Sequence, residues 1–139
     1  MPPSGKMEMQ LALEQVVDDL GVYPLEAYYF VQQGLAYTVD RIYGSSPVSG
    51  LCRHVTGQQL CHGLRELAQK QWGFLAQTVL RRWNITQTFD FGRIVFSLSR
   101  HNIMKTTPDD TIEDFRNVYQ FSKAFESAYR ISGKCRTLV

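Results

Sequence analysis

Apolar residues recur three or four positions apart along most of this chain, which is the spacing of one face of an α-helix. The clearest set is Phe91, Ile94, Val95 and Leu98, which falls at i, i+3, i+4 and i+7. We expect this face to be buried in the core with Leu60, Leu64 and Phe115. The whole pattern predicts about six helices, over residues 7–20, 24–33, 56–72, 74–83, 88–101 and 111–125.

The ends of these helices are marked by residues that favour terminal positions. Thr56 stands three positions before Gln59, which has the form of a capping box, and Thr111 stands in the same way before Asp114. Thr88 is the expected N-cap of the most amphipathic helix. Glycine and asparagine adopt the left-handed conformation at low cost, so five of them are expected stops: Gly21, Gly34, Gly73, Asn84 and Asn102.

Alternating residues predict a small sheet between the helices. Leu35, Tyr37 and Val39 alternate with more polar neighbours, which indicates a strand with one buried face. Residues 51–55 are expected to return as a second strand after the turn-rich loop 44–50, and 103–106 form a third short strand. The predicted fold class is therefore α+β, mainly helical, with the helices around a two- or three-stranded antiparallel sheet.

A weak internal repeat links the two parts of the chain. Residues 23–38 align with 91–106, so that Tyr23 lies over Phe91 and Gly34 over Asn102. This favours one supersecondary unit used twice. We expect one compact domain over 7–131, made of two similar tandem halves, with flexible termini; the halves are about 7–84 and 85–131 and the termini are 1–6 and 132–139.

Four short motifs also occur in a distinctive order. They are GLAYT at 34–38, HVTGQQL at 54–60, DFGRIVF at 90–96, and KT at 105–106 ahead of DDTIEDF at 109–115. Over about residues 9–126 the chain resembles a small uncharacterised bacterial protein family restricted to planctomycetes and verrucomicrobia. That family has no assigned activity, so the resemblance implies a bacterial, cytoplasmic protein and no functional residues.

Composition narrows the possible compartments and partners. A chain of 139 residues with 44% hydrophobic residues supports a packed core, and no apolar run approaches the roughly 18 residues of a membrane helix. The three cysteines fit a reducing compartment, and the N-terminus lacks the apolar stretch of a signal peptide. We therefore predict a cytoplasmic protein without membrane association.

The net charge of +2 is unevenly distributed along the chain. Residues 1–69 contain four Lys/Arg and seven Asp/Glu, whereas residues 70–139 contain eleven and six. A basic half is compatible with an anionic partner such as nucleic acid. Charges near helix ends also compensate the helix dipole, which requires no partner. The candidate nucleic-acid contacts under this alternative are Arg81, Arg82, Arg93, Arg100 and Lys105, of which Arg93 and Arg100 share a helix face.

One cluster contains residue types that bind metals. Cys52 and His54 would lie on one face of a strand, and Cys61 follows on the next helix. Its neighbour His62 points about 100° away around that helix, and the spacing matches no zinc finger or ribbon. We therefore expect no metal and no cofactor. A small metal or thiol site at Cys52, His54 and Cys61 is kept as a third hypothesis.

No pattern typical of catalysis is present. The chain lacks G-x-S-x-G, H-E-x-x-H and paired carboxylates in an apolar setting, which favours a protein without enzyme activity. Tyr28 and Tyr29 fall outside the core face of their predicted helix, so they are candidates for an exposed surface that binds a partner or a second copy. The leading hypothesis is a non-catalytic interaction or regulatory module.

Overall fold

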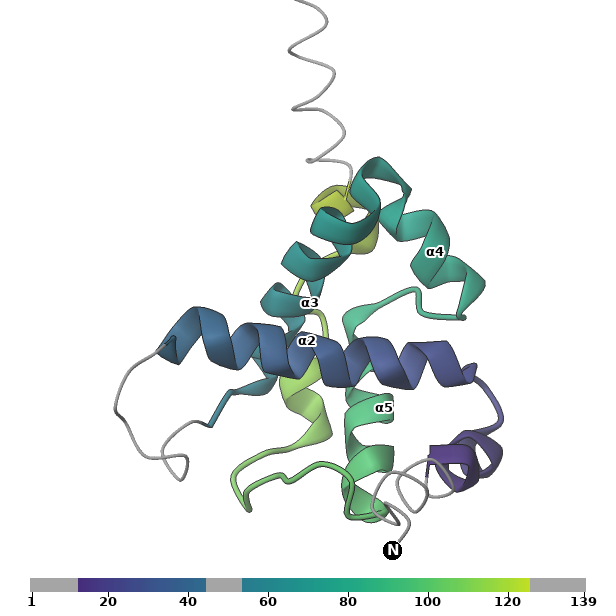
Figure 1. Ribbon diagram of the computed structural model, residues 1–139, viewed down its shortest axis with the longest axis vertical. Coiled ribbons are helices and arrows are strands. Elements are labelled where there is room, and N and C mark those ends of the chain that lie inside the picture. The colour runs from purple at the N-terminus through teal and green to yellow at the C-terminus, as the bar shows by residue number, and fades with distance from the viewer. Residues whose placement is uncertain (1–12, 45–53, 126–139) are drawn as a thin grey trace, which may run out of the picture.

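A computed structural model describes residues 13–44 and 54–125, and these residues form helices joined by short loops (Figure 1). Residues 13–20 are helical, as are residues 121–125. Between them lie α2 (Leu25–Tyr43), α3 (Gly57–Trp72), η2 (Gly73–Leu75), α4 (Ala76–Arg82), α5 (Thr88–Arg100) and η3 (Ile112–Phe115). The described residues contain no β-strand, so the predicted α+β fold with an antiparallel sheet is wrong.

The predicted first strand is the second half of α2. Gly34 does not end a helix but lies buried in the middle of α2, which continues to Tyr43. A side chain at position 34 would overlap Leu64 of α3, so glycine allows the two helices to approach closely. Interior glycine costs a helix about 1 kcal/mol relative to alanine. Here packing against α3 offsets that cost, and the helix stops instead at Gly44, where φ is 55°.

The two aligned segments of the internal repeat differ in structure at the position where the repeat predicts a helix end. Asn102 follows α5 with φ of 60°, whereas the aligned Gly34 is inside a helix. Residues 103–106, predicted as a strand, are irregular, because the N–H groups of Ile103 and Met104 donate to the Leu98 carbonyl at the end of α5. Residues 54–55 are likewise not a strand. The rest of the second predicted strand, at 51–53, lies outside the described residues, as do the predicted flexible termini 1–6 and 132–139.

Several predicted helix ends are confirmed. Thr56 and Gln59 form the expected capping box at the start of α3, and Gly73 ends that helix with φ of 57°. After α4, Asn84 takes φ of 65° and the Ile85 N–H donates to the Leu80 carbonyl at 2.9 Å. After α5, Ile103 donates to Leu98 in the same way at 2.9 Å. Both helices therefore end in the same left-handed turn, with an aliphatic residue directly after the asparagine.

One predicted N-cap and one predicted helix differ from expectation. Gln87, not Thr88, is the N-cap of α5, and the Asp90 carboxylate accepts from the Gln87 N–H at 3.2 Å. The Thr88 hydroxyl is buried instead and donates to the Phe115 carbonyl at 2.6 Å. Asp114 accepts from the Thr111 N–H at 3.1 Å, as expected, but only the short η3 follows.

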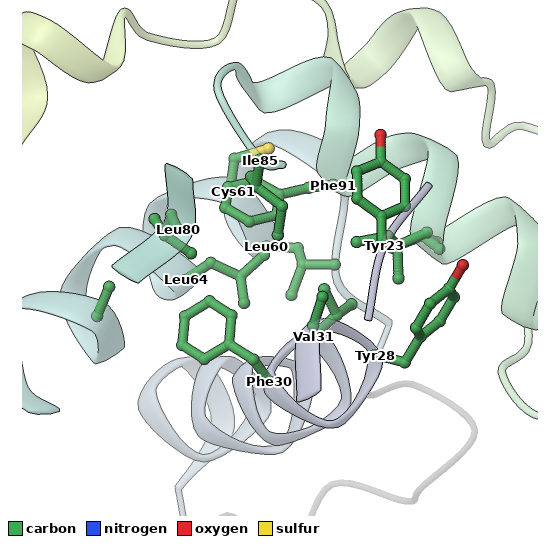
Figure 2. Packing of buried hydrophobic residues seen from close by; sticks show 14 of the residues in the cluster. Tyr23, Tyr28, Phe30, Val31, Leu60, Cys61, Leu64, Leu80, Ile85 and Phe91 are labelled. Atoms are coloured by element: carbon green, nitrogen blue, oxygen red, sulfur yellow. The ribbon is translucent and has the colours of Figure 1, made fainter. Parts of the chain in front are cut away.

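The predicted core is confirmed. Figure 2 shows α2 side chains such as Phe30 and Val31 pointing toward Leu60 and Leu64 of α3. All four residues of the apolar face of α5 are buried, as are Leu60, Leu64 and Phe115. Phe115 lies against two glycines, since a Cβ on Gly57 or Gly92 would come within 2.9 Å or 2.8 Å of its side chain. This packing attaches η3 to α3 and α5.

Polar contacts attach the start of the described chain to α5 and to the residues that flank it. The Tyr23 hydroxyl donates to the Asp90 carboxylate at 2.6 Å, and the Asn84 amide donates to the Val22 carbonyl at 2.8 Å. His101 contacts Asp19 at 2.6 Å. These contacts fix residues 13–24 beside α5 and so place Leu20 next to the exposed face of that helix. No helix within 13–44 or 54–125 is both long and apolar enough to cross a membrane.

Candidate functional site

Among the described residues, one face of α5 borders a groove of about 480 Å³. Arg93, Phe96 and Arg100 fall at i, i+3 and i+7, so they line one side of the helix. The groove, called here the α5 groove, is formed among the described residues by this side of α5 and by Leu20, Ser99 and Ile112.

The floor of the α5 groove is apolar and held in place by packing. Phe96 meets Phe115 edge-to-face, with ring centroids 6.2 Å apart. Leu20 packs against the core at the end of the helix over residues 13–20. Ile112 is the first residue of η3, whose position is fixed by the buried Phe115. The floor therefore exists before any ligand binds.

Arg93 is positioned at one end of the groove without donating a hydrogen bond to a described residue. Its Nη1 lies 3.9 Å from Asp90 Oδ1, beyond hydrogen-bonding distance, and its guanidinium stands 5.5 Å from the centroid of the Tyr23 ring. The Asp90 oxygens already accept from the Tyr23 hydroxyl and from the Thr86 N–H at 2.9 Å. Arg93 therefore forms a long ion pair with Asp90 but donates no hydrogen bond to a described residue, so its N–H groups can bind an external acceptor.

Arg100 stands at the other end of the groove. It is the last residue of α5 and is exposed, and within the described part of the chain it forms no ion pair or hydrogen bond. Its position at the helix C-terminus is electrostatically favourable for a cation. The groove thus presents two guanidinium groups, each able to bind a carboxylate through two hydrogen bonds, on either side of an apolar floor.

The structure brings together only two of the five basic residues predicted for nucleic acid. Arg93 and Arg100 share the α5 groove. Arg81 and Arg82 lie at the end of α4, which leads into the N-terminal end of α5, whereas Arg100 lies at the C-terminal end of α5 (Figure 1). Lys105 lies in the loop after α5, beside a separate cavity of about 130 Å³ that also contains His54 and Asp110. The five residues do not line one groove.

The predicted metal or thiol cluster does not assemble among the described residues. Cys52 lies outside them, and no group of three His, Cys, Asp or Glu side chains converges in 13–44 and 54–125. Cys61 is fully buried, which raises the pKa of its thiol to about 12 and disfavours the thiolate that metal binding requires. His54 contacts Asp110 at 3.2 Å, and the exposed His62 lies against Tyr119.

Only one of the two tyrosines predicted to form a partner surface is exposed. Tyr29 is 45% exposed, but Tyr28 is 0% exposed, so its assignment to a partner surface is wrong. The reason is that α2 is covered on two sides, and its buried residues include the adjacent pair Ala27 and Tyr28. Burial raises the pKa of Tyr28 to about 12, and its hydroxyl has no hydrogen-bond partner among the described residues.

Sequence reasoning identified the two arginines of the groove but not its apolar floor. The seven-residue spacing of Arg93 and Arg100 placed them on one helix face. Leu20 and Ile112 come from distant segments, and nothing local indicates that they meet α5. Comparisons with known proteins found no matching family model, curated protein or solved structure. The resemblance to the bacterial family therefore stays a prediction, and the function is argued from the groove.

Proposed function

We propose that the protein is a cytoplasmic, non-catalytic binding module whose α5 groove holds an acidic and apolar segment of a protein partner. The observation that supports this is the pairing of Arg93 and Arg100, neither hydrogen-bonded to a described residue, across an apolar floor. A ligand that matches both features has carboxylates at its ends and an apolar side chain between them.

A protein segment fits the groove better than a nucleic acid does. Nucleic acids are bound through rows of cations that follow the phosphate backbone, with planar bases stacked on exposed aromatic rings. Here the cations Arg81, Arg82 and Lys105 do not extend the groove, and its floor consists of Leu20, Ile112 and the partly buried Phe96. This apolar floor favours contact with an aliphatic or aromatic side chain of a protein.

The residues in the groove do not suggest a reaction. Ser99 is the hydroxyl-bearing residue among those that form it, and its Oγ lies 3.1 Å from the Thr106 hydroxyl rather than beside a base. No histidine, cysteine or carboxylate lines the groove within the described residues. General base catalysis requires such a group within hydrogen-bonding reach, so binding is the activity that these side chains support.

The proposal is tested by selecting peptides from a random 16-residue display library on the immobilised full-length protein. We expect selected peptides to be rich in Asp and Glu interspersed with Leu, Ile or Phe. Arg100→Glu should weaken their binding about tenfold or more, because it removes a charged donor and adds a repelling carboxylate. Arg82→Glu changes the net charge equally but lies outside the groove, so it should leave binding unchanged.

Three outcomes would contradict this function. The first is that no peptide is enriched, or that the enriched peptides lack acidic residues. The second is that single-stranded DNA or RNA binds at micromolar affinity with a steep salt dependence, and that both Arg82→Glu and Arg100→Glu weaken it. The third is that the protein sediments as a dimer that Arg100→Glu dissociates, since the groove would then hold a second copy of this chain.

A further inference from the structure

The two arginines of the α5 groove have a defined separation along the helix. Seven residues at 1.5 Å each place the Cα atoms of Arg93 and Arg100 roughly 10 Å apart. Seven residues also make nearly two full turns, so both side chains leave α5 on nearly the same side. Phe96 lies between them and forms the floor together with Leu20 and Ile112.

An α-helix reproduces this separation and an extended segment does not. In an extended chain, side chains on one face recur every two residues, at roughly 6.6 Å or 13 Å, and residues about 10 Å apart point to opposite faces. In a partner helix, two acidic residues at i and i+7 are again roughly 10 Å apart on one face. An apolar residue at i+3 or i+4 then lies midway and faces the apolar floor.

We infer that the partner segment is an amphipathic helix that lies along α5, with two acidic residues seven positions apart and an apolar residue between them at i+3 or i+4. This inference rests on the proposed function and names the secondary structure and residue pattern of the partner. Each carboxylate binds one of the two arginines, and the apolar side chain enters the groove between Phe96, Leu20 and Ile112.

The test uses two synthetic 16-residue peptides of identical composition on an alanine and glutamine background. One has glutamates seven positions apart with a leucine between them; in the other the glutamates are five positions apart, which places them about 140° apart around the helix. Hydrocarbon staples equalise their helicity, checked by circular dichroism. By fluorescence anisotropy, we expect the seven-residue spacing to bind the full-length protein about tenfold more tightly, because only it engages both arginines.

A charge exchange identifies the contact itself. Arg100→Glu should lower the affinity of the protein for the seven-spaced peptide about tenfold. A second peptide, in which arginine replaces one of the two glutamates, should bind the Arg100→Glu variant well and the original protein weakly. Equal affinity for both spacings would overturn the helical register and leave the proposed function intact, provided that Arg100→Glu still weakens both. Failure of both peptides while library peptides bind would also overturn the inference, and failure of both experiments would overturn the proposed function.

Discussion

Tyr23 and Tyr28 are two buried tyrosines of the same segment whose hydroxyl groups are in opposite situations. The Tyr23 hydroxyl donates to Asp90 at 2.6 Å, whereas the Tyr28 hydroxyl has no partner among the described residues. Their rings meet edge-to-face with centroids 6.4 Å apart, so the two sites share one environment. The pair therefore isolates the effect of one buried hydrogen bond.

We expect Tyr23→Phe to lower the free energy of unfolding by about 1.5–3 kcal/mol, because it removes a buried hydrogen bond to a carboxylate. Tyr28→Phe should leave the stability unchanged or raise it by about 1 kcal/mol, since it removes a hydroxyl that is buried without a partner. Urea unfolding of both variants measures the difference. Equal losses in the two variants would show that the Tyr28 hydroxyl is satisfied by an ordered water or another group.

At the scale of elements, the crossing of α2 over α3 depends on two glycines. A Cβ on Gly34 would overlap Leu64, and a Cβ on Gly63 would overlap Thr38. The Thr38 hydroxyl donates to the Gly34 carbonyl at 2.7 Å, so it is held within α2 and cannot easily move aside. The two helices are therefore closer than side chains larger than hydrogen would permit at either position.

Gly34→Ala should destabilise the protein by about 1–3 kcal/mol through overpacking of this crossing. The sign of the change in stability is decisive, because helix propensity alone predicts that the same substitution stabilises the protein by about 1 kcal/mol. Gln33→Ala, at the exposed neighbouring position, serves as the control and should change the stability by less than about 0.5 kcal/mol. A Gly34→Ala variant as stable as the original in thermal and urea unfolding would refute the close approach.

At the scale of the whole molecule, the features that depend on a few neighbouring residues were predictable. Thr56 with Gln59, Asn84 and Asn102 mark helix ends through local backbone chemistry, and the apolar face of α5 follows from its periodicity. The path of α2 was not predictable in this way. Gly34 reads as a stop unless one knows that Leu64 packs against it, which is a tertiary contact.

In the candidate site, too, the local features were predictable from the sequence and the tertiary contacts were not. Arg93 and Arg100 were placed on one helix face by their spacing, because that relation is internal to α5. The groove also needs Leu20 and Ile112, which reach α5 only through the folding of other segments. The prediction that Tyr28 is exposed is wrong for the same reason. Periodicity indicates one buried face of α2, whereas this helix is covered on two sides and buries more residues.

The stability of the molecule should fall in alkaline solution because of its buried thiol. Burial raises the pKa of Cys61 from 9.0 to about 12. The unfolded chain therefore releases this proton at lower pH than the folded protein does, so the stabilisation is complete below pH 9 and is lost as the pH rises toward 12. The free energy of unfolding of the original protein should fall between pH 8 and pH 10. In Cys61→Ala this fall should be smaller by about 1 kcal/mol. Urea unfolding at both pH values measures this, and parallel pH profiles would contradict it.

The contacts that attach the start of the described chain to α5 have a consequence for the order of folding. Asp19, Val22 and Tyr23 bind groups that lie 82, 62 and 67 positions further along the chain. Closing such long loops costs more entropy than joining sequence neighbours such as α3 and α4, so we expect residues 13–24 to dock last. Leu20 arrives with them. The floor of the α5 groove is therefore complete only when the chain has finished folding, and a folding intermediate in which residues 13–24 have not docked cannot bind a partner there.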